Sequence, residues 1–175
     1  MISFTVVGEP VTKGSVTAFV PKRADGSYVK RPDGSPLVVK HDDTGDRGKS
    51  SAGDIAKAAL AARTSACERL YRDSALSVTL RFYVLRPSGQ FGSGRNSGLV
   101  KDSAPAHPAK RPDVDKYVRH VLDALKGVVY ADDGQVVEVS AVKLFGDPAR
   151  TEVEIQPMPE QTMGELMRPA LTVAA

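Results

Sequence analysis

The segment from Pro112 to Gly127 constrains the fold more than any other part of this sequence. Its apolar residues recur three or four positions apart: Val114, Tyr117, Val118, Val121, Leu122 and Leu125. This spacing is typical of an amphipathic helix with one buried face. Pro112 marks a helix start, and Lys126 followed by Gly127 marks a stop. We therefore predict a helix from about Asp113 to Lys126.

The same segment and the turn after it carry five aspartates: Asp113, Asp115, Asp123, Asp132 and Asp133. Carboxylates are the ligands that Mg²⁺ and Mn²⁺ prefer, and Mg²⁺ usually takes one or two of them together with waters and a substrate phosphate. An ion held in this way acidifies a water and neutralises charge when a phosphodiester is hydrolysed. The aspartates therefore make a metal-dependent hydrolase our leading hypothesis.

The helix pattern divides these aspartates into groups. Asp113 and Asp115 fall at the helix start, whereas Asp123 falls within the helix and is expected to be a structural or surface residue. The chain after the helix, if extended, is long enough to return over the roughly 20 Å to the helix start. We therefore expect Asp132 or Asp133 to reach the same site.

Each aspartate also has a structural explanation. Asp113 follows a proline and can cap the helix, where its charge suits the positive end of the dipole. Asp132-Asp133-Gly134 can form an ordinary turn. A structural role is the more frequent one for each residue taken singly. A cap needs only one carboxylate, however, so capping does not account for Asp115. The set as a whole therefore favours a metal site.

Several motifs of this chain occur together in one known family. They are Pro112-Asp113-Val114-Asp115-Lys116, Val121-Leu122-Asp123-Ala124-Leu125, Gly127-Val128, Tyr130-Ala131-Asp132-Asp133-Gly134-Gln135-Val136 and, near the N-terminus, Gly8-Glu9-Pro10-Val11-Thr12-Lys13-Gly14. In order, spacing and residue type they resemble the signature of the RusA family of Holliday junction resolvases. The resemblance implies a small endonuclease, mostly of phage or prophage origin. It further implies a homodimer that uses Mg²⁺ or Mn²⁺ and resolves four-way DNA junctions by paired nicks.

The resemblance also implies roles for individual residues. Asp113, Asp115 and Asp133 correspond to the catalytic, metal-binding aspartates of the family, and Asp132 is a further candidate metal ligand beside the last of them. The basic residue of the family, one helical turn beyond the second aspartate, falls on Arg119. A guanidinium keeps the charge at that position and suits phosphate.

Other basic residues are candidates for contacting DNA. Lys116 stands where many family members carry asparagine, so either Lys116 or Arg119 is the cation that faces the substrate. Lys13, Lys110 and Arg111 complete the set of candidate DNA-binding residues.

Composition limits the class of protein. A length of 175 residues predicts one domain with one modest core. A pI near 9.0 and a net charge of +3 suit a polyanionic partner. The single cysteine, Cys67, excludes an internal disulfide, fits a reducing compartment and is expected to fill space in the core. No apolar run approaches the roughly 20 residues of a membrane helix. We therefore expect no membrane partner, and a location in the bacterial cytoplasm or, for a phage protein, the host cytoplasm.

The remaining patterns predict an α+β fold, with a two-layer arrangement of a mixed β-sheet of about five strands and two main helices packed on it. Strands are expected over 2–7, 76–85, 136–145 and 151–155, the last two as an antiparallel hairpin. The other helix is expected from Asp54 to about Tyr71. We expect one endonuclease domain over 1–157 and a C-terminal tail over 158–175.

Two basic segments lie outside this core. Residues 12–49 contain turns at Asp25-Gly26 and Asp33-Gly34, and 27–31 could pair with 37–40 as a hairpin. This segment is either a phosphate-contacting arm or a solvated hairpin. Residues 86–111 carry five basic residues and one acidic residue. They predict either a flexible basic loop that orders on DNA or a tolerated insertion.

Two other classes of function stay open. One is a catalytically silent protein of the same fold that binds branched DNA, and cleavage of a four-way junction with Mg²⁺, compared with EDTA, separates it from a nuclease. The other is a metal-dependent hydrolase of nucleotides. It has less support, because the glycines from Gly89 to Gly98 do not match a phosphate-cradling loop.

Overall fold

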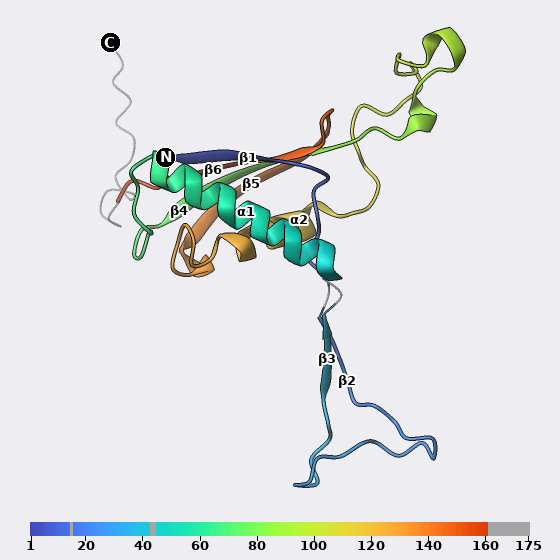
Figure 1. Cartoon of the computed structure of the whole chain (residues 1–175), viewed down its shortest axis with the longest axis vertical. Coiled ribbons are helices and arrows are strands. Elements are labelled where there is room, and N and C mark those ends of the chain that lie inside the picture. The colour runs from blue at the N-terminus through green and yellow to red at the C-terminus, as the bar shows by residue number, and fades with distance from the viewer. Residues whose placement is uncertain (15, 43–44, 161–175) are drawn as a thin grey trace, which may run out of the picture.

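The computed structural model describes residues 1–14, 16–42 and 45–160. Its body is a four-stranded sheet with two helices on the same side, and a long arm projects from one end (Figure 1). The strands are β1 (Ile2–Val7), β4 (Leu76–Val84), β5 (Val136–Phe145) and β6 (Arg150–Pro157), and the helices are α1 (Gly45–Ser65) and α2 (Val114–Leu125). The predicted α+β fold with a mixed sheet is confirmed, with four strands in the main sheet instead of about five.

The strands lie in the order β1-β6-β4-β5. β6 is antiparallel to both β1 and β4, whereas β4 and β5 are parallel and are connected through α2. The predicted hairpin between β5 and β6 is therefore wrong, because β4 lies between them. The connection passes the end of β4, where the Gly146 amide donates to the Val84 carbonyl at 3.1 Å. A Cβ at Gly146 would come within 2.6 Å of the Tyr83 side chain, which explains the glycine.

The core lies between the sheet and the helices. Alternate residues of β4 are buried in it: Leu76, Val78, Leu80 and Phe82. From α2, the ring of Tyr117 stacks on Phe82 with 5.1 Å between the ring centroids. On the opposite face of β4, Ser77 is buried, whereas Thr79, Arg81 and Tyr83 are partly exposed, and Arg81 pairs there with Glu154 of β6. The sheet thus has one apolar, covered face and one polar face.

α2 confirms the helix predicted from the apolar spacing. It spans Val114–Leu125, with Asp113 as its N-cap. Its buried apolar residues are Tyr117, Val121 and Leu125, and Val118 and Leu122 pack against the same core. Val114, in the first turn, is 38% exposed and does not belong to the core.

The start of α1 differs from the prediction. The helix begins at Gly45 instead of Asp54. The added turns contain glycines and serines, which are weak helix formers, so propensity does not reveal them. They pack against α2, where Gly48 is buried and the Ser51 hydroxyl lies 3.2 Å from Nε2 of His120. Tertiary packing therefore stabilises this part of the helix.

The end of α1 differs as well. The helix ends at Ser65 instead of near Tyr71, and Cys67 adopts a left-handed conformation with φ 54°. The Glu68 amide donates to the Arg63 carbonyl at 3.0 Å, a hydrogen bond typical of a helix C-terminus. Because glycine usually occupies such a position, a cysteine did not signal the end. Cys67 is exposed, so the expectation that it fills space in the core is wrong.

The first basic segment forms the arm. β2 (Val16–Phe19) pairs antiparallel with β3 (Val39–Asp42), and the chain between them makes two tight turns. The predicted pairing of 27–31 with 37–40 is confirmed in part. The Leu37 amide donates to the Val29 carbonyl at 2.9 Å, whereas Lys40 lies opposite Ala18.

The second basic segment, residues 86–111, contains two short 3-10 helices, η1 (Ser88–Gln90) and η2 (Gly94–Asn96). An isolated antiparallel β-bridge joins Phe91 to Val100, on either side of η2. The flexibility expected of this loop stays a prediction. Most of the predicted C-terminal tail, residues 161–175, lies outside the described residues. No helix within the described ranges is long and apolar enough to cross a membrane.

Candidate functional site

Asp113 and Asp115 lie at the N-terminal end of α2 with their carboxylates on the surface. Asp113 occupies the N-cap with extended backbone angles, φ −75° and ψ 145°. Within the first turn of α2, all of which is described, its side chain accepts no hydrogen bond from the backbone. Among the described residues, Lys116 forms an ion pair with it, with Nζ 3.7 Å from Asp113 Oδ2. Although Asp113 holds the cap position, the fold does not use its carboxylate as a cap.

Asp132, in contrast, acts as a helix cap. Its carboxylate accepts a hydrogen bond from the Gly134 amide at 2.9 Å, and the Gln135 side chain accepts from the Asp132 amide at 3.0 Å. These bonds form a capping box for the 3-10 helix η3 (Asp133–Gln135). The structural explanation is therefore correct for Asp132 and does not extend to Asp113.

Lys126 holds both aspartates of this turn. Its Nζ donates to Oδ2 of Asp132 at 2.7 Å and to Oδ1 of Asp133 at 3.0 Å. These two hydrogen bonds raise the pKa of Lys126 above its ordinary value. The bond from Lys126, together with the one from the Gly134 amide, lowers the pKa of Asp132. Sequence reasoning missed this role, because it treated Lys126 only as a helix stop.

The two pairs of aspartates lie at opposite ends of α2, so the expectation that the turn returns to the helix start is wrong. The distance from one end to the other is about 20 Å. The buried Tyr130 explains the geometry, because its hydroxyl donates to the Leu122 carbonyl at 2.8 Å and draws the turn against the end of the helix. Among the described residues, no three His, Cys, Asp or Glu side chains gather in a way that could hold a metal ion.

Asp123 has the structural role that the helix pattern predicts. It forms an ion pair with Lys13. The Lys13 amide also donates to the Lys116 carbonyl at 3.2 Å, so the segment after β1 is fastened along α2. The role of Lys13 in binding DNA stays a prediction, and its ammonium group already contacts a carboxylate.

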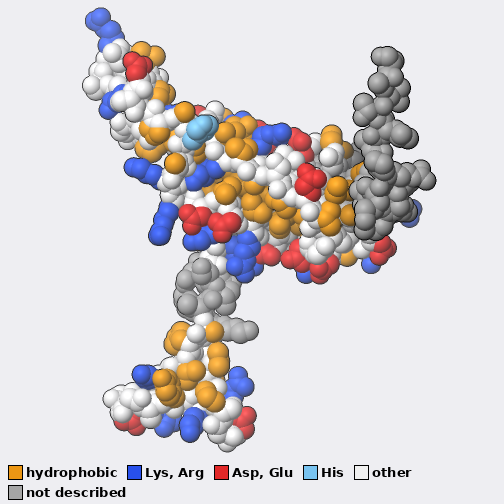
Figure 2. All heavy atoms as spheres, turned by 180° about the vertical axis from the view of Figure 1, so that it is seen from behind, with side chains coloured by type: hydrophobic (Ala, Val, Ile, Leu, Met, Phe, Trp, Pro, Cys, Tyr) orange, Lys and Arg blue, Asp and Glu red, His pale blue; other side chains and the backbone are white. Residues whose placement is uncertain are grey.

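The other candidate cations are exposed around the start of α2: Lys110, Arg111, Lys116 and Arg119. Figure 2 shows Lys and Arg side chains gathered around a few acidic ones at the end of the body from which the arm leaves. The chain entering α2 is fixed by Lys143 of β5, whose Nζ donates to the carbonyls of Lys110 and Pro112 at 2.7 and 2.8 Å. Sequence reasoning missed Lys143, although a lysine within an apolar strand was a usable signal.

His120 is buried between the two helices. It is 3% exposed, contacts Ser51, and borders a cavity of about 300 Å³ between α1, α2 and residues 6–11. Burial lowers the pKa of His120, which therefore stays neutral at physiological pH. Its contacts give it a structural role.

The molecule is an α+β domain with surface carboxylates at a helix start and basic segments beside them, an arrangement that suits a polyanionic substrate. Residues 47–156 match the family model described as endodeoxyribonuclease RusA. The chain is also 32% identical over 158 residues to the protein of Bacillus subtilis (strain 168) described as "Uncharacterized protein YqaN". That match covers 89% of this chain and 95% of the relative. The chain belongs to the RusA family of endodeoxyribonucleases, a nuclease family that acts on DNA, and the resemblance of its motifs between Pro112 and Val136 is confirmed.

Proposed function

We propose that this protein is a Mg²⁺-dependent endodeoxyribonuclease, with Mn²⁺ as an alternative ion, that resolves Holliday junctions by paired phosphodiester hydrolysis. It acts as a homodimer on four-way branched DNA, in recombination and repair, in the cytoplasm of a bacterium or of a phage host. One observation carries the proposal. In a nuclease family, two exposed carboxylates stand two residues apart at the start of α2, and the one at the cap position is not used as a cap.

The carboxylates fit the expected ion by chemistry and by number. Mg²⁺ is commonly bound through one or two carboxylates, waters and a substrate phosphate, so Asp113 and Asp115 are the two carboxylates of α2 that would hold it on DNA. The ion would supply an acidified water and neutralise the charge of the reacting phosphate. The turn aspartates lie about 20 Å away within one chain. In the homodimer, a second copy is therefore the source from which Asp133, with Asp132 beside it, would join the site.

Arg119 is the cation that we assign to the scissile phosphate. It lies one turn beyond Asp115 on the same helix, and its side chain is exposed. Lys116, the other candidate, is drawn toward Asp113 at 3.7 Å. A guanidinium also offers phosphate a planar pair of donors, and a cation placed there stabilises charge that develops in the transition state. Lys110 and Arg111 would hold the DNA backbone beside the site.

The test is cleavage of a synthetic four-way junction by the wild-type protein with Mg²⁺, compared with EDTA and with a linear duplex of the same sequence. We expect paired nicks on the junction with Mg²⁺ and no cleavage with EDTA. Equal cleavage of the linear duplex would contradict junction selectivity. Tight binding of the junction without any nick, with either Mg²⁺ or Mn²⁺, would instead favour a catalytically silent binding protein. That second candidate is supported by the absence of a three-carboxylate group within the described residues of one chain.

A further inference from the structure

The arm contains two copies of one turn. The sequence Lys22-Arg23-Ala24-Asp25-Gly26-Ser27 is followed by Lys30-Arg31-Pro32-Asp33-Gly34-Ser35. In the first copy the Arg23 amide donates to the Ser27 carbonyl at 2.8 Å, and in the second the Arg31 amide donates to the Ser35 carbonyl at 2.8 Å. The glycines have nearly the same left-handed backbone, with φ 82° and 85°. The two turns are structural repeats, each beginning with a lysine and an arginine.

The acidic residue of each turn is used within the turn. Oδ1 of Asp25 accepts from the amide and the hydroxyl of Ser27 at 2.9 and 2.7 Å. Asp33 accepts from Ser35 in the same way, at 2.9 and 2.6 Å. The serine hydroxyl, and then the serine amide, lower the pKa of each carboxyl, which fixes it in its charged, hydrogen-bonded form. The carboxylates thus stabilise the turns.

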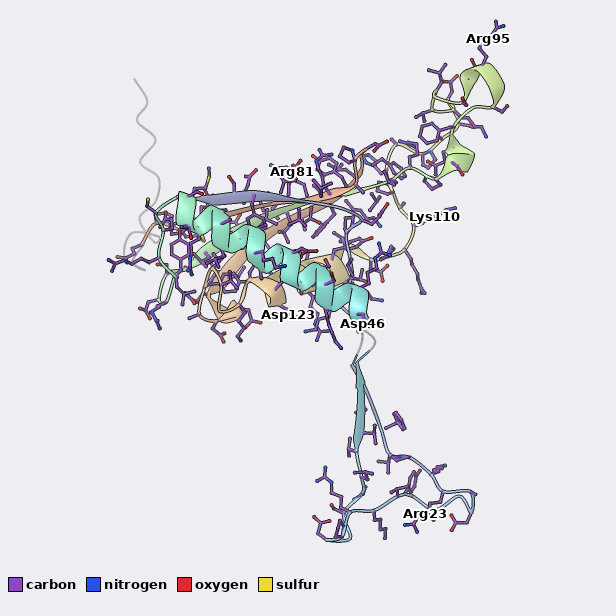
Figure 3. The ribbon with its side chains drawn as sticks, viewed as in Figure 1. Arg23, Asp46, Arg81, Arg95, Lys110 and Asp123 are labelled. Atoms are coloured by element: carbon purple, nitrogen blue, oxygen red, sulfur yellow. The ribbon has the colours of Figure 1, made fainter. Side chains whose placement is uncertain are left out.

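The four basic side chains, in contrast, are exposed: Lys22, Arg23, Lys30 and Arg31. Among the described residues, no ion pair joins any of them to an acidic side chain. Figure 3 shows Arg23 far out on the arm, whereas Arg95 lies at the tip of the other basic projection. The arm therefore presents positive charge at a distance from the body.

Exposed apolar side chains accompany these charges on the arm. Phe19 is 51% exposed, Tyr28 is 54% exposed and Val38 is 45% exposed. The ammonium group of Lys22 lies over the ring of Tyr28, 5.1 Å from its centroid. Cations interleaved with exposed aromatic rings suit a nucleic acid, which offers phosphates to the cations and apolar sugar and base surfaces to the rings.

We propose that the two dibasic turns form a second DNA-binding site, which grips the phosphate backbone of one arm of the branched substrate away from Asp113 and Asp115. The contact is independent of sequence, because it reads phosphates. The inference rests on the proposed function for the identity of the ligand as DNA. It adds a binding surface outside residues 47–156, the part of the chain that matches the RusA family model.

The salt dependence of DNA binding tests this proposal. Each phosphate contact contributes about 0.9 to the slope of log Kobs against log salt concentration on duplex DNA. The slope is negative, and its magnitude should therefore decrease by about 1.8 in Lys22→Ala/Arg23→Ala and by the same amount in Lys30→Ala/Arg31→Ala. In the variant with all four substitutions the magnitude should decrease by about 3.6. These changes keep the aspartates, serines and glycines that form the turns.

Binding is measured by fluorescence anisotropy on a labelled four-way junction in EDTA, so that cleavage does not interfere. The control matched to either double variant is Arg69→Ala/Arg72→Ala, which also removes two positive charges, from exposed positions after the far end of α1. We expect the control to keep the wild-type slope. A fourfold variant with the slope and affinity of the wild type would overturn the proposal. The proposal would also be overturned if the fourfold variant lost only self-association, measured by sedimentation, because the arm would then bind a second copy of the chain.

Nicking assays separate this proposal from the proposed function. A wild-type protein that binds the junction but never cuts it contradicts the nuclease assignment, while reduced slopes of the arm variants would still support the second site. A protein that cuts the junction but whose arm variants keep the wild-type slope contradicts only the second site.

Discussion

The two ends of α2 carry aspartates of the same family signature, but the fold uses them differently. At the C-terminal end, Asp132 caps η3 and both turn aspartates bind Lys126. At the N-terminal end, Asp113 stands at the cap position without serving as a cap, and Asp115 is exposed beside it. A carboxylate that the fold does not need is a better indication of function than its place in a motif.

The largest expected effect is complementation between two inactive variants. If Asp115 of one copy works with Asp133 of another, a mixed dimer of Asp115→Asn and Asp133→Asn has one intact site. Nicking should therefore return when the two variants are co-expressed with different tags and purified as the mixed dimer.

The control for complementation is a mixed dimer of Asp113→Asn and Asp115→Asn, which lie at the same end of the helix. It should stay inactive, because each of its sites contains one changed residue. Failure of the Asp115→Asn and Asp133→Asn mixture to nick would show that the two ends of α2 do not meet across a dimer.

A smaller effect is expected where the turn is fastened to the C-terminal end of α2. Tyr130→Phe removes the hydrogen bond to the Leu122 carbonyl and should lower the free energy of unfolding by about 1 kcal/mol. Urea denaturation measures this change. The matched control is Tyr28→Phe, which removes the hydroxyl of a tyrosine that is 54% exposed on the arm. If both variants lose the same stability, the Tyr130 hydrogen bond does not hold the turn.

The caps at the two ends should also differ. Asp132→Ala removes a carboxylate that accepts from the Gly134 amide and from Lys126, so it should lower the urea midpoint. Asp113→Ala removes no helix-capping hydrogen bond and should leave the midpoint nearly unchanged. A larger decrease in the urea midpoint for Asp113→Ala than for Asp132→Ala would show that the fold needs the Asp113 carboxylate, which would contradict the site assignment.

The smallest expected effect is a pH dependence of stability from His120. Because burial lowers its pKa in the folded state, the unfolded chain takes up a proton first as the pH falls below about 6.5. The free energy of unfolding should therefore decrease from that pH downward, until the pKa of the folded state is passed. Burial is the main cause of the lowered pKa, because the charge of Asp123 raises the pKa of His120 and the charge of Lys13 lowers it.

His120→Gln should reduce this pH dependence, measured by urea denaturation at pH 7.5 and 5.5. His107→Gln, on the exposed basic loop, should preserve it. If the two variants share the same pH profile, burial of His120 is not the cause.

Those parts of the fold that follow from local patterns could be predicted from the sequence. α2 and the strands β1 and β5 are examples, because the spacing of apolar residues in α2 and the apolar runs of β1 and β5 mark where these elements lie. The start of α1 could not be predicted, since its glycines and serines become helical only where they pack against α2. The order of the strands could not be predicted either, because a short connection after β5 is compatible with a hairpin and with a passage across β4.

The candidate site shows the same division. The positions of Asp113 and Asp115 at a helix start follow from the sequence. The path of the chain to Asp133 does not, because its length permits a return to the helix start without requiring one. The path is determined by Tyr130, whose buried side chain holds the turn against the C-terminal end of α2.

Whether the start of α2 is the active site is tested by the nicking rate of Asp115→Asn on a four-way junction with Mg²⁺. It is compared with Asp46→Asn, which changes an exposed aspartate in the first turn of α1. Both proteins are assayed at junction concentrations that saturate binding, measured separately in EDTA. We predict a rate about 100-fold or more below wild type for Asp115→Asn, with unchanged junction binding, and a wild-type rate for Asp46→Asn. Wild-type nicking by Asp115→Asn would contradict the assignment of the active site to the start of α2.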